Sequence, residues 1–117
     1  MSFNILNSPI KDLMYGNLLP KHDERGYNER VFCLYEFNDI FKFNKNIVQV
    51  NRSLSKNRGT IRGCHFQMPP FLETKIIFCT KGRLFDVGVD LRKNSETYLK
   101  YFSLELSPEN KKFLIVP

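Results

Sequence analysis

His65 lies in the stretch RGCHFQMPP, residues 62–70, and its side chain is the one best suited to proton transfer near neutral pH. An imidazole can act as a general base, a metal ligand or a hydrogen-bonded structural group. A zinc site needs three or four converging ligands, and this stretch adds only Cys64. The spacing therefore disfavours zinc and leaves a structural histidine and a general base as the open interpretations.

Two carboxylates flank a glycine in RLFDVGVDL, residues 83–91. In a strand, alternate residues share a face. One face would be apolar, with Phe85, Val87, Val89 and Leu91. The other would carry Leu84, Asp86, Gly88 and Asp90. If the second face is turned inward, we expect a polar cavity in which Asp86 orients an imidazole; the alternative is a solvated surface.

Five more polar residues are candidates for binding. Lys75 begins the apolar stretch KIIFC, so its ammonium either reaches solvent or donates to a developing oxyanion. Arg25 and Arg62 each precede a glycine, which suits a phosphate because the guanidinium binds it in two places; the alternative is an ordinary surface charge. Gln49 and Asn51 share a strand face and could bind a hydroxyl or carbonyl, or else the edge of a sheet.

Strands must position these residues, because the chain is 14% aromatic and has Phe and Tyr but no Trp. Apolar alternation between turn signals predicts strands at residues 47–53, 60–67, 74–80, 83–91, 98–106 and 112–116. Lys81 and Gly82 predict a hairpin between the third and fourth of these. Residues 10–19 suggest a short strand or arm, Gly26 a turn, and residues 38–46 a short helix. The last predicted strand has no partner after it, which predicts an open sheet edge.

Length and charge limit the classes of protein. A chain of 117 residues suits one domain, residues 1–117, and the net charge of +6 fits an anionic partner or an ordinary basic surface. No run of five basic residues and no long apolar run occurs, so we expect neither a nucleic-acid nor a membrane partner. The three cysteines are odd in number and lack a CxxC pair, which favours reduced thiols in the cytoplasm.

Five blocks taken in order resemble the dTDP-4-dehydrorhamnose 3,5-epimerase family. They are DERG, QVNRS, GTIRGCHFQMPP, KGRLFDVGVDLRKNSETY and LSPENKKFLIVP, and the similarity runs from about Asp23 to Pro117. The resemblance implies an all-β, cupin-like (jelly-roll type) β-barrel, incomplete at its C-terminal end, in a cytoplasmic homodimer. It also implies epimerisation at C3 and C5 of dTDP-4-keto-6-deoxyglucose, on the route to dTDP-L-rhamnose, related deoxysugars and lipopolysaccharide O-antigen.

The resemblance also implies a role for each candidate residue. His65 matches the proton acceptor, and Asp86 matches a carboxylate near the reacting centre. Five further residues match the family's substrate contacts, namely Arg25, Gln49, Asn51, Arg62 and Lys75. The C4 ketone acidifies the neighbouring protons and takes up the charge, so no cofactor is expected.

The chain departs from the family pattern at three places. The family's binding glutamate, five residues after the DERG arginine, is Arg30 here, and the nearest acid, Glu29, is the candidate ligand. Cys64 replaces a leucine. The family segment IPxGFAHGF and the later tyrosine proton donor have no counterpart before Pro117, and none of the five tyrosines matches that donor. Two alternatives to an active epimerase therefore stay open: an inactive remnant or nucleotide-sugar-binding module, and an unrelated β-domain that binds RNA or an acidic partner.

The spacing of Arg62 and His65 adds a geometric expectation. Residues three apart lie on opposite faces of a straight strand. Both can serve one pocket only if the strand is bulged or Arg62 reaches round the rim, and Gly63 is the natural place for a bulge.

Overall fold

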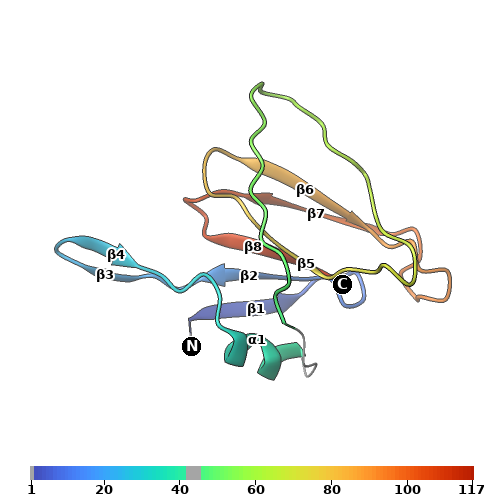
Figure 1. The fold of residues 1–117 in the computed structure, drawn as a ribbon, viewed down its shortest axis with the longest axis horizontal. Helices are drawn as coiled ribbons and strands as arrows, with labels where there is room; N and C mark the ends of the chain where they lie inside the picture. The colour runs from blue at the N-terminus through green and yellow to red at the C-terminus, as the bar shows by residue number, and fades with distance from the viewer. Residues whose placement is uncertain (1, 42–45) are drawn as a thin grey trace. The chain divides into compact units, whose positions relative to one another are not determined.

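The computed structural model describes residues 2–41 and 46–117, which contain eight strands and one helix (Figure 1). The chain divides into two units, each described by itself below. The larger comprises Met1–Phe32 and Glu73–Pro117, and the smaller comprises Cys33–Leu72. The prediction of a β-rich chain is confirmed.

A four-stranded antiparallel sheet is the base of the larger unit. Its strands, in spatial order, are β1 (Phe3–Asn7), β2 (Met14–Leu18), β8 (Lys112–Val116) and β5 (Lys75–Phe78). The predicted open edge at the last strand is wrong. β8 pairs with β2 on one side and with β5 on the other, so the last strand of the sequence is central in the sheet.

A second antiparallel pair consists of β6 (Leu84–Val89) and β7 (Tyr101–Leu106). The predicted hairpin across Lys81 and Gly82 is wrong, because β5 pairs with β8 while β6 pairs with β7. The segment between β5 and β6 therefore connects two sheets. Four predicted strands are confirmed as β5 to β8, although β7 begins at Tyr101 because Leu99 has a φ of +63°.

The two sheets of the larger unit pack through a buried apolar cluster. It joins Leu106 of β7 to Leu114 of β8 and to Ile10 and Leu13 of the β1–β2 turn, all at most 5% exposed. Burying one such side chain contributes roughly 1.5–3 kcal/mol. Around these residues pack Tyr15, Ile77, Cys79, Phe102, Leu104 and Val116. The cluster fixes which face of each sheet is turned inward.

A separate two-stranded hairpin follows β2. It pairs β3 (Lys21–Asp23) with β4 (Gly26–Asn28), and all of its residues are exposed. Gly26 has a φ of +138°, a conformation that favours glycine, so the predicted turn at Gly26 is confirmed.

The smaller unit contains one helix, α1 (Leu34–Phe41). The helix predicted at residues 38–46 thus begins earlier, and residues 42–45 lie outside the described part of the chain. The strands predicted at residues 47–53 and 60–67 are wrong. Residues 46–72 are exposed and contain no strand, because a strand requires a partner backbone and these segments pair with none of the described residues.

Candidate active site

The eight candidate site residues fall into both units. The larger unit carries Arg25, Glu29, Lys75 and Asp86; the smaller carries Gln49, Asn51, Arg62 and His65. Of the four in the larger unit, Lys75 and Asp86 lie opposite residues that pack against the same apolar cluster.

Asp86 lies on the inward face of β6. It stands directly opposite Leu104, which packs against the core cluster, and it is itself half-buried. Burial raises the pKa of the Asp86 carboxyl, partly offset by a hydrogen bond from the backbone of Val87. The inward orientation that the sequence left open is thus observed, and it holds a carboxyl that binds protons more readily than in water.

Lys75 lies on the inward face of β5. It stands opposite Val116 and shares its strand face with Ile77, and both of these residues pack against the core cluster. Its ammonium forms an ion pair with Glu73 at 3.0 Å, and the Lys75 side chain is 36% exposed. Lys75 and Asp86 therefore border one apolar cluster from opposite sheets, and an ammonium so placed can donate to an oxyanion.

Arg25 lies in the turn of the exposed β3–β4 hairpin. Its guanidinium bonds to Asp23 at 2.7 Å, and its backbone N–H donates to the same carboxylate at 2.8 Å. The hydrogen bond lowers the pKa of Asp23 and raises that of Arg25. The side chain of Arg25 is 85% exposed, so the guanidinium stays accessible to an anion.

Glu29 is paired within the larger unit. Its carboxylate forms an ion pair with Lys111 at 3.1 Å, and the Lys111 ammonium lies 3.9 Å from the centre of the Tyr27 ring. Contact with Tyr27 and then with Glu29 raises the pKa of Lys111. All three residues line a cavity of about 160 Å³. Sequence reasoning missed Lys111 and Tyr27, because no sequence spacing connects β4 to the β7–β8 turn.

Arg62 and His65 lie in the exposed segment of the smaller unit. Gly63, between them, has a φ of +108°, but the predicted bulge is not observed because residues 60–67 form no strand. A Cβ on Gly63 would lie 3.2 Å from Nδ1 of His65, so the absent side chain leaves room for the imidazole. The Arg62 guanidinium donates to Ser55 Oγ and to the carbonyl of Leu54, both at 2.9 Å.

Gln49 and Asn51 are exposed in the same segment.

Within residues 2–41 and 46–117, no three His, Cys, Asp or Glu side chains converge as a metal site would require. The same residues contain no helix long and apolar enough to span a membrane.

Comparison with solved structures defines the class of protein. The crystal structure of dTDP-4-dehydrorhamnose 3,5-epimerase from Elizabethkingia anophelis superimposes on this chain with a TM-score of 0.92 and 37% sequence identity. The alignment covers 100% of this chain and 63% of that chain. A Legionella pneumophila epimerase in complex with dTDP-4-keto-L-rhamnose gives a TM-score of 0.90 at 31% identity, covering 98% of this chain and 60% of that one. The likeness to these sugar-nucleotide epimerases confirms the predicted cupin-like class.

Sequence comparison identifies the family. Residues 7–117 match dTDP-4-dehydrorhamnose 3,5-epimerase, and the chain belongs to this family. The Sinorhizobium fredii epimerase is 48% identical over 93 residues, 73% of this chain and 48% of its own length. The Shigella flexneri epimerase is 35% identical over 114 residues, 97% of this chain and 62% of its own length. The chain thus spans about half to three fifths of the length of these relatives.

Proposed function

We propose that this chain is an isomerase that epimerises dTDP-4-keto-6-deoxyglucose at C3 and C5 in the dTDP-L-rhamnose route. The observation that carries the proposal is the family match over residues 7–117, which includes every candidate site residue. The inward positions of Lys75 and Asp86 support it, because they place an ammonium and a proton-binding carboxyl beside one apolar cluster.

In the proposed chemistry this chain supplies the base and the oxyanion donor, and water supplies the proton that returns. His65 removes the proton from C3 or C5, and the electron pair of the broken C–H bond moves into the C4 carbonyl to form an enolate. Lys75 stabilises the enolate oxygen, and Asp86 assists near the reacting centre. A proton from water, added to the opposite face of the carbon, restores the ketone with inverted configuration.

The remaining candidate residues have proposed binding roles. Arg25 and Arg62 bind the diphosphate, because a guanidinium pairs with phosphate oxygens at two points. Gln49 and Asn51 hydrogen-bond hydroxyl or carbonyl groups of the sugar. Glu29, paired with Lys111 beside the cavity, is proposed as a further substrate contact.

Deuterium incorporation tests the reaction. The protein is incubated with dTDP-4-keto-6-deoxyglucose in deuterated water, and deuterium and configuration at C3 and C5 are read by NMR. We expect deuterium with inversion, and we expect His65→Asn to abolish both while His22→Asn, on the exposed hairpin, leaves them unchanged. Incorporation that survives His65→Asn would disprove the assigned base.

A second candidate function is binding of the nucleotide sugar without turnover. It is favoured by the exposed guanidinium of Arg25, which stays accessible to a diphosphate whether or not turnover follows. Saturable binding of the dTDP-sugar in calorimetry with no deuterium incorporation would establish it. Absence of binding would overturn both functions.

We further propose that residues 1–117 act as one domain, in a cytoplasmic homodimer, in carbohydrate biosynthesis that includes O-antigen. The continuous family match across both units supports the single domain. The unpaired thiols of Cys33, Cys64 and Cys79 support a reducing compartment. The apolar residues exposed on β6 support a second copy as partner.

A further inference from the structure

The carboxylate of Asp90, directly after β6, is buried with only 1% of its side chain exposed. Its backbone N–H donates to the carbonyl of Lys100 at 2.9 Å, and its carbonyl accepts from Leu99 at 2.7 Å. Asp90 therefore extends the β6–β7 pairing and is held rigidly at the end of that hairpin.

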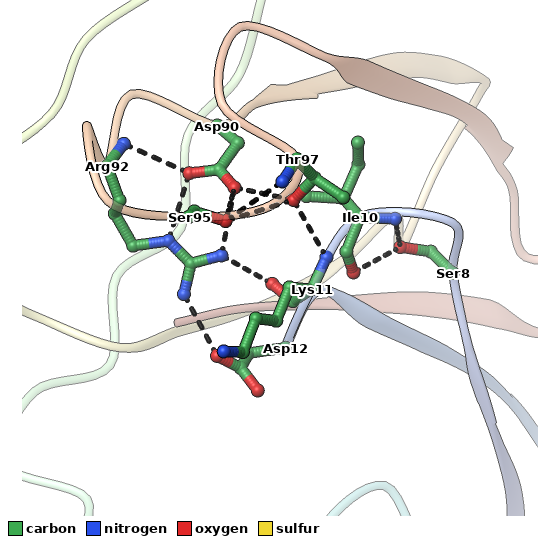
Figure 2. Close-up of polar contacts among 8 residues, drawn as sticks. All are labelled: Ser8, Ile10, Lys11, Asp12, Asp90, Arg92, Ser95 and Thr97. Atoms are coloured by element: carbon green, nitrogen blue, oxygen red, sulfur yellow. Dashed lines mark hydrogen bonds and ion pairs between the residues drawn. The ribbon is translucent and has the colours of Figure 1, made fainter.

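Side-chain donors occupy both oxygens of this carboxylate (Figure 2). Oδ1 accepts from the backbone N–H and Nε of Arg92 at 3.0 and 2.9 Å. Oδ2 accepts from the hydroxyls of Ser95 and Thr97, each at 2.6 Å. These bonds, that of Arg92 foremost, hold the pKa of Asp90 far below its usual range. A carboxylate so fully bonded is fitted to organise structure and not to take up a ligand.

The same donors reach the β1–β2 turn (Figure 2). Arg92 donates to the carbonyl of Lys11 at 2.6 Å and to the Asp12 carboxylate at 2.9 Å. The Lys11 N–H donates to the hydroxyl of Thr97 at 3.2 Å. We call the group that joins the two loops the Asp90 cluster; its members are Lys11, Asp12, Asp90, Arg92, Ser95 and Thr97.

The turn held by the Asp90 cluster packs against the inward face of β6. A Cβ on Gly88 would lie 2.9 Å from Cδ2 of Leu13, so a Leu13 methyl group rests on the backbone of Gly88. Gly88 shares its strand face with Asp86, two residues away. Beyond the turn, the rings of Tyr15 and Phe102 lie 5.5 Å apart and join the same two sheets.

We propose that the Asp90 cluster positions Asp86: by fixing the β1–β2 turn to the end of β6, it sets how β6 sits on the sheet that carries Lys75. The role of Asp86 at the reacting centre rests on the proposed function, whereas the geometric link does not. Lys11, Asp12, Asp90, Arg92, Ser95 and Thr97 are thus positioning residues and not catalytic ones.

Thr97 gives a sharp test, because its hydroxyl contacts both Asp90 and Lys11. Thr97→Val removes the hydroxyl at nearly constant volume, and Thr97→Ser keeps it. In Thr97→Val we expect the nuclear Overhauser effect between the Leu13 methyls and the Gly88 Hα to weaken at least two-fold, and the carboxyl titration of Asp86 to move toward that of a solvated aspartate. Thr97→Ser should preserve both signals.

A second pair of variants keeps the test decisive if Thr97→Val does not fold. Asp12→Asn weakens the exposed end of the Asp90 cluster and should shift both signals in the same direction. Asp23→Asn is its matched control, because Asp23 also pairs with an arginine, Arg25, but lies on the exposed hairpin outside the Asp90 cluster. Unchanged signals in every folded variant of the cluster would overturn the proposal.

Activity separates this proposal from the proposed function. If the parent incorporates deuterium, Thr97→Val should lower the rate at least ten-fold with little change in substrate affinity, and Thr97→Ser should restore it. If the parent incorporates none, the proposed function fails, while the NMR signals of Leu13, Gly88 and Asp86 still decide the positioning role.

Discussion

Asp86 in β6 and Asp90 directly after β6 lie four residues apart, yet their surroundings have opposite effects on the pKa. Asp86 is half-buried with a single backbone hydrogen bond, and its pKa is raised. Asp90 is more deeply buried, but its bonds to Arg92, Ser95 and Thr97 lower its pKa. Hydrogen bonding thus outweighs desolvation at one carboxylate, while desolvation prevails at the other.

At Asp90 we predict that Asp90→Asn lowers the free energy of unfolding at pH 7 by about 2–3 kcal/mol, because hydrogen bonds to a charged group are lost. A depressed folded-state pKa contributes stability above the unfolded value of 3.8, and that stability declines as the pH falls below it. Urea titrations at pH 7 and pH 3 should therefore show a smaller difference between parent and variant at the lower pH. If parent and variant differed in stability equally at pH 7 and at pH 3, the depressed pKa of Asp90 would be contradicted.

At Asp86 we predict that the same kind of substitution changes the free energy of unfolding in the opposite direction. A raised folded-state pKa gives stability that is present below the unfolded value of 3.8 and is lost as the pH rises through the folded value. Asp86→Asn should therefore increase the free energy of unfolding at pH 7, and the gain should vanish near pH 3. Loss of stability at pH 7 in the same urea titrations would show that Asp86 is stabilised by a contact and not strained by burial.

At the scale of elements, the β6–β7 hairpin turns Asp86 inward and part of its apolar surface outward. Leu106 is fully buried against the sheet, whereas Phe85 on the other face of the hairpin is 70% exposed. This arrangement places Asp86 toward the core cluster and not on a solvated surface.

The orientation of the β6–β7 hairpin can be tested by comparing a Leu→Ala substitution at a buried position with one at an exposed position. Leu106→Ala should cost about 2–5 kcal/mol because it opens a cavity in the core cluster. Leu91→Ala, on the exposed face at 46% exposure, should change stability by less than about 1 kcal/mol. Similar losses in urea unfolding would contradict the inward orientation of Leu106.

Elements were predicted well where local pattern decides them. Alternation identified β5 to β8, and Gly26 identified the turn of the β3–β4 hairpin, because both signals act within a few residues. Pairing was predicted poorly: β8 proved central and β5 did not pair with β6. Pairing depends on backbone partners far away in sequence, which alternation does not specify.

At the scale of the whole molecule, β6 and β7 expose an outer apolar face. It consists of Phe85, Val87, Val89 and Tyr101, each at least 36% exposed. Exposed apolar surface of this kind marks contacts with other chains. The outer apolar face therefore supports the proposed association with a second copy.

Sedimentation measures this association. We expect the parent to form a dimer and Phe85→Asp to weaken it at least ten-fold, because a carboxylate placed in an apolar contact must lose its water. Asn94→Asp adds the same charge at an exposed turn and should leave the dimer intact. A monomeric parent, or equal effects of the two variants, would remove the outer apolar face as the dimer contact.

The sequence alone determined the family, the β-rich class and the candidate residues, because motif order and alternation are properties of the chain itself. It also singled out Gly63, which has a φ of +108°, although the strand in which a bulge was expected does not form. Only the tertiary structure decided that Asp86 faces inward, that Glu29 pairs with Lys111, and that Asp90 joins two loops. Each of these depends on which distant segments pack together, and long-range packing is set by burial and hydrogen bonding across the whole fold.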